Sequence, residues 1–197
     1  MHSDKDILAA FIDIQKVMLP KITIEVGAYD ADFSKSMVGI AKEIYAFEAS
    51  PFVYEKFKDI PGVDYRNLAI SDVSGEIDFE IQIDQHKLTS NNSIMKRNDK
   101  GNKEYISVKS STLNELFEDK KNIALWIDCE GANGQVLTGA SSILPNIGSI
   151  CIEVETARFW KDQWLEQDVK EYLAGFGFRL SMSEPQYTNQ FNQIYIR

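Results

Sequence analysis

The sequence predicts a single α/β domain built on a mostly parallel, seven-stranded sheet with helices on both faces. Short runs rich in β-branched residues alternate along the chain with amphipathic segments of helical length, which is the order expected of a parallel sheet with crossover helices. Two of the runs, IALWI and SICIEV, are almost continuously apolar, as strands covered on both faces are. The 197 residues, 44% of them apolar, suit one domain with a continuous core.

Hydrophobic periodicity and turn residues place the elements along the chain. Apolar residues that recur every three or four positions indicate helices, and apolar runs or strict alternation indicate strands. Pro20 ends the first helix, and Pro51 stands where the third helix begins. The expected order is a helix at 6–18, a strand at 21–28, a helix at 32–42, a strand at 43–47, a helix at 51–60, strands at 63–70, 76–83 and 105–109, a helix at 111–119, a strand at 123–128, a helix through 136–137, a strand at 149–154, a helix at 166–174, and closing strands at 176–182 and 191–197.

The strand at 76–83 is expected to be antiparallel and half exposed, because every second residue in it is apolar. The polar stretch 84–103 that follows predicts a long loop. Its His86 either reaches over a pocket as an acid or base or stays exposed to solvent. Its segment TSNNS, residues 89–93, either contacts a substrate or lies on the surface.

Charge and composition limit the partners that we expect. Thirty acidic residues against 21 basic ones give a net charge of −9. Because nucleic-acid affinity depends on clustered Lys and Arg, we expect no nucleic-acid partner. No apolar run approaches the about 20 residues that span a bilayer, and residues 1–5 lack the features of a secretory signal. We therefore expect a cytoplasmic protein with two reduced cysteines and no membrane partner, and the oligomeric state stays open.

Acidic residues close four of the apolar strands. Placing a carboxylate at the end of a buried strand is costly, so four such ends suggest a site rather than a structural accident. Open α/β sheets bind their ligands outside the carboxyl ends of the strands. These acids are Glu25 after the first strand, Glu48 after the second, Asp128 and Glu130 after IALWI, and Glu153 and Glu155 after SICI.

The spacing of Glu25 and Glu48 suggests a nucleoside ligand without a phosphate. Glu48 lies 23 residues beyond Glu25, near the roughly 20-residue offset at which an acid meets ribose hydroxyls in dinucleotide-binding folds. Gly27 provides a tight turn for close backbone approach, but Tyr29 and Ala31 stand where further phosphate-binding glycines would be. S-adenosylmethionine is the commonest ligand that has a ribose and lacks a phosphate.

Several stretches, in this order, carry a family resemblance: EVGAYDADFS, IYAFEASPFVYEKFK, YRNLAISDVSGEIDF, VKSSTLNEL, WIDCEGANGQVLTGASSIL and ICIEVE. They cover roughly residues 20–155, and the closing FNQIYIR is similar to the family's last strand. The chain resembles the FkbM-type methyltransferases. The resemblance implies a Rossmann-like class I methyltransferase sandwich, S-adenosyl-L-methionine as cofactor, and O-methylation of a hydroxyl on a saccharide or another small molecule.

The resemblance also implies roles for particular residues. Glu25 and Gly27 would line the methionine end of the cofactor, Glu48 would bind the ribose hydroxyls, and Asn67 and Ala69 would lie near the adenine. Asp128 and Glu130 would face the reacting methyl group and the acceptor. The remaining cofactor contacts that we expect are Ala28, Tyr29 and Ala49.

The chain departs from the family pattern at four positions. The family usually has Asp at 25, Asn at 29, Gly at 31 and Glu at 133, where this chain has Glu25, Tyr29, Ala31 and Asn133. Glu25 is a conservative change, and the third glycine of nucleotide-binding loops can be Ala. Tyr29 is placed to crowd or cover the cofactor. Asn133 removes an acid that would otherwise serve as a base or a metal ligand.

Methyl transfer to a hydroxyl needs an in-line geometry and a group that takes the proton. Asp128, Glu130 and Glu153 are the candidate catalytic residues, and clustering raises the pKa of such carboxylates. Their alternative role is to accept bonds from backbone amides at helix starts. The same oxygens suit Mg²⁺ or Ca²⁺, and no His-rich spacing suggests zinc or iron. We expect no required metal.

The domain divides into an N-terminal helix at 1–20, a cofactor-binding core at 21–155, and a C-terminal helix with closing strands at 156–197. Phe159, Trp160 and Trp164 form an apolar wall for an acceptor, an oligomer contact or the packing of a covering helix. Two other functions stay open. One is a catalytically degenerate cofactor- or ligand-binding domain of the same fold, which the changes at 29, 31 and 133 favour. The other is a nucleotide-linked oxidoreductase, which the missing glycines disfavour.

Overall fold

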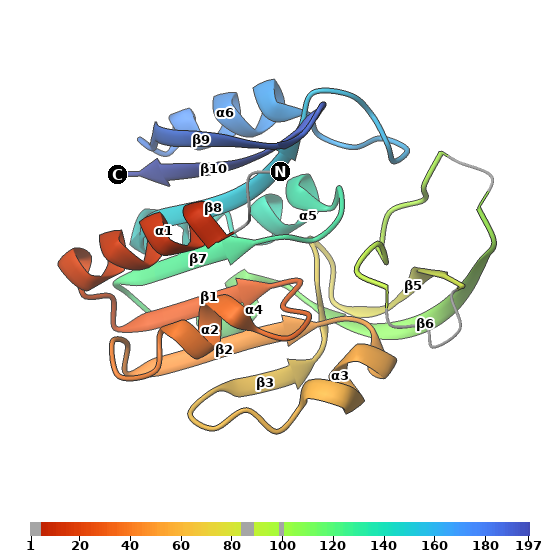
Figure 1. The fold of residues 1–197 in the computed structure, drawn as a ribbon, viewed down its shortest axis with the longest axis horizontal. Helices are drawn as coiled ribbons and strands as arrows, with labels where there is room; N and C mark the ends of the chain where they lie inside the picture. Colours follow the sequence, from red (N-terminus) through yellow and green to blue (C-terminus); the bar gives the residue numbers. More distant parts are fainter. Residues whose placement is uncertain (1–4, 84–88, 99–100) are drawn as a thin grey trace.

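The computed structural model describes residues 5–83, 89–98 and 101–197. A seven-stranded sheet with the order β3-β2-β1-β7-β8-β10-β9 runs through the molecule, and a three-stranded sheet, β4-β6-β5, stands beyond the carboxyl ends of its strands (Figure 1). The helices are α1 (Lys5–Met18), α2 (Asp32–Ser36), α3 (Pro51–Phe57), α4 (Leu113–Phe117), α5 (Asn133–Thr138) and α6 (Glu166–Gly175). The strands are β1 (Ile22–Val26), β2 (Glu43–Glu48), β3 (Asp64–Asn67), β4 (Ala69–Ile70), β5 (Gly75–Gln82), β6 (Lys103–Ser111), β7 (Ile123–Ile127), β8 (Ile147–Glu155), β9 (Arg179–Tyr187) and β10 (Gln190–Ile196).

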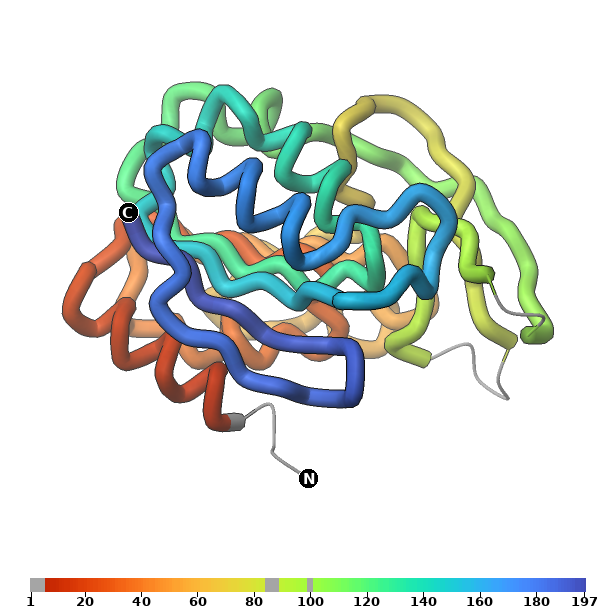
Figure 2. Tube along the Cα trace, turned by 90° about the horizontal axis from the view of Figure 1, so that it is seen from above, coloured from red at the N-terminus to blue at the C-terminus, as the bar shows by residue number. Residues whose placement is uncertain are grey.

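The predicted fold class is confirmed. In the large sheet β1 pairs in parallel with both β2 and β7, β7 pairs in parallel with β8, and β10 is antiparallel to β8. Every residue of β1 and β7 is buried, as expected of central strands. Helices α1 and α2 pack on one face of the sheet, and α4, α5 and α6 pack on the other (Figure 2). The carboxyl ends of β1, β2, β7 and β8 therefore meet at one edge.

Two expected elements are divided or shortened. The strand predicted at 63–70 splits, because β3 joins the large sheet beside β2 while β4 pairs with β6 in the small one. The helix predicted at 32–42 ends at Ser36, and Gly39 at φ +86° lies in the turn that follows. The antiparallel pairing expected of residues 76–83 is confirmed by β5 and β6.

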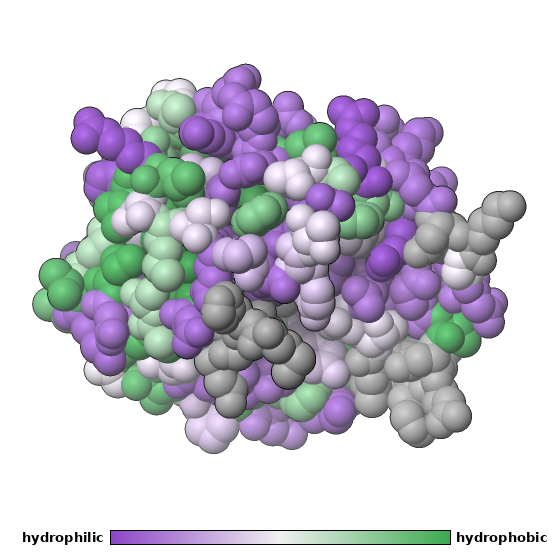
Figure 3. Space-filling view, turned by 45° about the horizontal axis from the view of Figure 1, so that its top comes forward, coloured by the Kyte–Doolittle hydropathy of each residue, from purple (hydrophilic) through white to green (hydrophobic). Residues whose placement is uncertain are grey.

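The two ends of the large sheet differ in character. The end at the amino side of the strands carries an apolar groove of ≈ 440 Å³ lined by Ile14, Val17, Met18 and Ile196, with Asp13 at its edge. Figure 3 shows hydrophobic side chains gathered at the left, where Figure 1 places the last turn of α1 and the end of β10, and a mostly hydrophilic surface elsewhere on this face. In the part of the chain that the structure describes, no helix is long and apolar enough to cross a membrane.

Candidate active site

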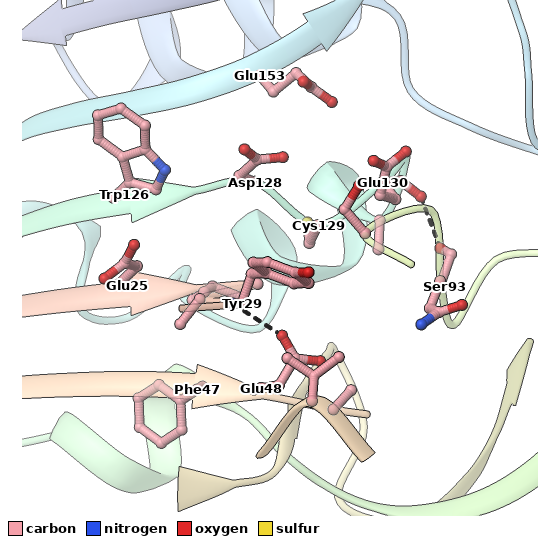
Figure 4. Close-up of a pocket in the computed structure, with 18 of the residues that line it drawn as sticks. Glu25, Tyr29, Phe47, Glu48, Ser93, Trp126, Asp128, Cys129, Glu130 and Glu153 are labelled. Atoms are coloured by element: carbon pink, nitrogen blue, oxygen red, sulfur yellow. Dashed lines mark hydrogen bonds between the residues drawn. The ribbon is translucent and has the colours of Figure 1, made fainter. Parts of the chain in front are cut away.

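A cavity of ≈ 870 Å³ opens at the carboxyl edge of the large sheet, near the upper end of the about 300–1,000 Å³ range of small-molecule sites. Its walls come from the loops after β1, β2 and β7, from β8, from the segment 89–94 and from the β9–β10 hairpin. Figure 4 shows the acidic side chains that point into it. The lining includes Glu25, Gly27, Ala28, Tyr29, Glu48, Ala49, Ala69, Asp128, Glu130 and Glu153 from the sequence prediction.

Gly27 is required where the loop after β1 meets the loop after β7. Its φ is +76°, a conformation that costs an L-residue roughly 1–2 kcal/mol. A Cβ built on Gly27 would lie 1.7 Å from the carbonyl oxygen of Asp128. The sequence predicted that this glycine lets the backbone approach a ligand. In the structure the approach that excludes a side chain is to the backbone of Asp128.

Glu25 is buried beneath the loop after β1. Its carboxylate accepts a hydrogen bond from the backbone N–H of Ser34 at 2.8 Å, which fixes the first turn of α2. Burial raises the pKa of the Glu25 carboxyl from 4.5 to about 7, and the bonds from Ser34 and Phe33 oppose the rise. Glu25 therefore positions the helix that follows the loop as well as lining the cavity.

Glu48 ends β2 and is held by backbone amides on both of its oxygens. The N–H of Tyr29 donates to Oε2 at 3.0 Å (Figure 4). The N–H of Ser50 donates to Oε1 at 2.7 Å. Burial raises the pKa of this carboxyl to about 7, with a further contribution from the charge of Asp128. Each carboxylate oxygen has two lone pairs, so Glu48 is fixed in place and still able to accept bonds from a ligand.

Tyr29 and Ala31 both adopt left-handed backbone conformations, at φ +46° and +59°. Glycine and asparagine tolerate this region best, and these are the residues that the family usually has at 31 and 29. Tyr29 lines the cavity and its ring contacts Phe57 with centroids 5.4 Å apart. Ala31 is fully buried at the start of α2. Compared with the family's Asn and Gly, Tyr29 and Ala31 therefore increase the backbone strain of the loop after β1.

Of the residues expected near the adenine, Ala69 lines the cavity and Asn67 does not. The Asn67 amide donates to the carbonyl oxygens of Glu48 and Ala49 at 2.8 and 3.1 Å. It therefore braces the loop after β2 instead of facing a ligand. Apolar residues that the sequence analysis did not single out complete this wall: Phe47, Val53, Leu68, Ile70 and Phe79.

Asp128, Glu130 and Glu153 come together at the opposite end of the cavity. One carboxylate oxygen from each lies within 4.8 Å of the others, and Figure 4 shows the three side chains around one space. Glu130 has φ +49°, and its carbonyl accepts a bond from the Ser93 hydroxyl at 2.7 Å. The grouping predicted from the strand ends is therefore present in the structure.

The carboxyls of Glu130 and Glu153 hold their protons more tightly than ordinary acids. Burial raises the pKa of Glu130 to about 8, and the charges of Asp128 and Glu155 add to the rise. Burial also raises the pKa of Glu153 well above its ordinary value. Glu155 lies just behind them with its pKa raised by burial to about 7, and Gln163 donates to its Oε2 at 2.7 Å. Clustered buried acids shift in this direction because each disfavours the charge of the next.

Asn133, where the family usually has Glu, is buried and does not line the cavity. Its Nδ2 donates to the carbonyl oxygen of Glu153 at 2.5 Å, and its Oδ1 accepts from the Cys129 thiol at 3.3 Å. Asn133 thus joins the loop after β7 to β8. The departure from the family pattern at this position removes no acid from the cavity wall.

The segment 89–94 lines the cavity from the side of the small sheet. Ser93 pairs with Glu80 of β5 through two backbone bonds, at 2.7 and 3.1 Å, and the Asn92 Oδ1 accepts from the Gln82 N–H at 3.0 Å. The segment TSNNS therefore lines the cavity, and its contact with a substrate stays a prediction. His86 lies outside the described residues.

Of the aromatic residues after β8, Trp160 is buried and Trp164 packs partly buried against the core, whereas Phe159 is exposed. A Cβ on Gly131 would meet the Trp160 ring at 2.6 Å, and one on Gly134 would meet the Trp164 ring at the same distance. Neither ring lines the cavity.

Four residues of the β9–β10 hairpin line the cavity: Gln186, Tyr187, Gln190 and Asn192. Sequence analysis missed them, although the polar residues at alternate positions of QFNQIYIR were the available signal.

Comparisons with known proteins agree with this architecture. A family model described as the methyltransferase FkbM domain matches residues 25–180. No curated protein matches the chain in sequence. Among solved structures, an rRNA methylase from Streptococcus thermophilus is 14% identical, with a TM-score of 0.56 over 95% of this chain and 94% of that one.

Two further similar structures hold the cofactor or its product. Magnesium protoporphyrin IX methyltransferase from Synechocystis PCC 6803, with bound S-adenosylmethionine, is 9% identical with a TM-score of 0.54, over 98% of this chain and 77% of that one. The 1,6-didemethyltoxoflavin-N1-methyltransferase of Burkholderia thailandensis, with bound S-adenosylhomocysteine, is 11% identical with a TM-score of 0.50, over 98% and 79%. The shared fold is that of class I methyltransferases, whose cofactor is S-adenosylmethionine. RNA methylases have this fold too, so the fold does not support the predicted exclusion of nucleic acid.

Proposed function

Because the chain belongs to the FkbM methyltransferase family, we propose that it transfers the methyl group of S-adenosylmethionine to a hydroxyl of a small molecule such as a saccharide. The observation that carries the proposal is one continuous cavity with a fixed carboxylate, Glu48, at one end and the acids Asp128, Glu130 and Glu153 at the other. The first end suits a nucleoside, and the second suits a hydroxyl that must lose a proton.

Residues at the carboxyl ends of β1 and β2 would hold the cofactor. Glu48 accepts bonds from the ribose hydroxyls, as its place at the end of the second strand of the sheet allows. Gly27, Ala28 and Tyr29 border the methionine end, and Ala49 and Ala69 border the adenine. The negative charge of Asp128 would favour the positive sulfonium of the cofactor.

In the transfer step the acceptor oxygen attacks the methyl carbon as the carbon–sulfur bond breaks. The acceptor proton passes to a carboxylate of the group at 128, 130 and 153. A base works best when its pKa is near the operating pH, and the pKa of Glu130, raised to about 8, meets this condition. Holding the two reactants in line supplies the rest of the acceleration.

A small neutral acceptor fits the charge of the site better than a nucleic acid does. The chain carries a net charge of −9, and the acceptor end of the cavity is lined by acids. Phosphates would be repelled there. Sugar hydroxyls would instead find many oxygen and amide partners, among them Asn91, Asn92 and Asn192.

The first experiment is thermal unfolding with and without S-adenosylmethionine and S-adenosylhomocysteine. Ligand at 100 times its Kd stabilises by about 2.7 kcal/mol, which raises the Tm of a domain of this size by roughly 5–11 °C. Glu48→Ala should abolish the rise. Glu55→Ala should not, because Glu55 is an exposed acid paired with Lys58. No rise at millimolar ligand would contradict the proposed cofactor site.

The second experiment follows label from the methyl group of S-adenosylmethionine into a panel of monosaccharides and other hydroxyl compounds. Labelled product that is lost in Glu130→Gln supports O-methylation. Cofactor binding with no transfer to any hydroxyl in the panel would instead favour a binding domain of the same fold.

A further inference from the structure

The carboxylates at the acceptor end of the cavity have the spacing of cation ligands. One oxygen each from Asp128, Glu130 and Glu153 lies within 4.8 Å of the other two. Oxygens that surround Mg²⁺ or Ca²⁺ at about 2.0–2.6 Å lie roughly 3–5 Å from one another. A cation placed among the three would therefore need little movement of the side chains.

A second observation concerns Glu153 alone. This residue is 5% exposed, and its Oε1 has no hydrogen-bond partner among the residues that the structure describes. Gln190 bonds to the same carboxyl, which leaves Oε1 as a buried acceptor without a donor. Such a group costs roughly 1–3 kcal/mol. Figure 4 shows the Glu153 carboxylate turned toward the space beside Asp128 and Glu130.

The arrangement differs from the other buried acids of the cavity. The carboxylates of Glu25 and Glu48 each accept at least one backbone N–H, so their burial is compensated within the protein. At the other end of the cavity, carboxylate oxygens of Asp128, Glu130 and Glu153 lie close to one another, and the negative charge of Asp128 adds to the rise in the pKa of both Glu130 and Glu153. A divalent cation would reverse that repulsion.

We propose that Asp128, Glu130 and Glu153 bind a divalent cation that prefers oxygen ligands, with Mg²⁺ as the physiological ion. The three carboxylates supply only oxygen, which favours Mg²⁺, Mn²⁺ or Ca²⁺ over zinc. The nearby Cys129 thiol is bonded to Asn133 and takes no part. Mg²⁺ commonly keeps several waters, so positions facing the cavity stay open to an acceptor hydroxyl.

The consequence for catalysis rests on the proposed function, whereas the cation site does not. A hydroxyl that coordinates the cation loses its proton more easily, as metal-bound water does. With the cation bound, the three acids would act as its ligands in place of the base role proposed above, and the acceptor proton would pass to solvent water.

The test uses Mn²⁺ as the probe, because its electron paramagnetic resonance signal is lost on binding. Titration of the full chain should show one Mn²⁺ site, from which Mg²⁺ displaces the probe. Glu153→Gln and Asp128→Asn should each weaken Mn²⁺ binding at least tenfold. Glu48→Gln removes a buried acid from the same cavity but outside the group, and it should change the Kd less than threefold.

S-adenosylhomocysteine binding, measured on the wild type, separates the two proposals, and thermal unfolding reports whether each variant is folded. Mn²⁺ binding without S-adenosylhomocysteine binding would count against the proposed function alone. S-adenosylhomocysteine binding with no saturable Mn²⁺ site at millimolar concentration would overturn the cation site. A Mn²⁺ site that both variants retain unchanged would overturn it as well.

Discussion

The two halves of the cavity treat buried carboxylates in opposite ways. In the cofactor half, the carboxylates of Glu25 and Glu48 accept bonds from backbone amides and thereby shape the loops around them. In the acceptor half, Asp128, Glu130 and Glu153 face one another, and the Glu153 Oε1 has no partner within the described chain. The difference is that backbone amides hold the carboxylates of the first half in place, whereas no donor within the described chain reaches the buried Glu153 Oε1 in the second.

The halves are joined where the loop after β1 passes the loop after β7. Gly27 contacts the backbone of Asp128 there, and the Asp128 N–H donates to the Val26 carbonyl at 2.9 Å. Under the proposed function, the distance between cofactor and acceptor depends on this contact, which allows no side chain at Gly27. A side chain added at this junction should therefore cause a large loss of stability.

Gly27→Ala should destabilise the protein by at least about 3 kcal/mol, because the backbone strain of a positive φ adds to a clash with a carbonyl oxygen. Gly39→Ala is the matched control, since Gly39 has φ +86° and a Cβ added there would meet nothing within 4 Å. It should cost only about 1–2 kcal/mol. Urea denaturation and the yield of folded protein measure both. Equal losses for the two variants would contradict the role given to the junction.

The stability of the ligand-free protein should fall as the pH rises from about 4.5 to about 7. The pKa of Glu48 is raised from 4.5 to about 7 in the folded state, so the folded protein binds more protons than the unfolded chain in this interval. The stabilisation is present below pH 4.5 and is lost above pH 7, and for this one carboxyl it amounts to roughly 3 kcal/mol.

Urea denaturation at several pH values checks this expectation, and Glu48→Ala should show a shallower dependence on pH than the wild type. Carboxyl-carbon NMR titration provides a direct comparison within the chain. Glu48 should titrate near 7, whereas Glu43, bonded to Lys120 and Tyr45, should titrate below 4.5 because its pKa is lowered. A wild-type stability that rises from pH 5 to pH 7 would contradict the assignment.

Ala31→Gly should give the smallest effect, a stabilisation of about 0.5–1 kcal/mol. Ala31 has φ +59°, and relief of this strain should exceed the entropy that glycine adds to the unfolded chain. Ala28→Gly is the matched control, because Ala28 is also buried and does not have a positive φ. It should destabilise by about 0.4–1 kcal/mol. Thermal unfolding measures the change in stability of both variants. We expect changes of opposite sign, and changes of the same sign would contradict the strain assigned to Ala31.

Much of the fold and of the acidic site follows from local sequence signals. Apolar runs that end in an acid identify β1, β2, β7 and β8, and parallel pairing brings their ends to one edge. That is why Glu25, Glu48, Asp128, Glu130 and Glu153 could be grouped from sequence, and all five line the cavity.

Features that depend on distant contacts could not be predicted in the same way. The division of 63–70 arises because β4 pairs with β6, about 40 residues later in the chain. Gln190 and Asn192 reach the cavity only because β10 returns antiparallel to β8, which places Asn192 beside Glu153. Asn67 is the last residue of β3, as Glu48 is of β2, but its amide bonds to the neighbouring loop. No periodicity in the sequence reports such pairings.

The central claim is that the half of the cavity around Glu48 holds the cofactor and the half around Asp128 receives the acceptor. A crystal structure with S-adenosylhomocysteine tests it most directly. We expect ribose hydroxyls within about 2.5–3.0 Å of the Glu48 carboxylate and the sulfur on the side of Asp128. An adenosyl group bound outside the cavity, or within it without contact to Glu48, would contradict the claim.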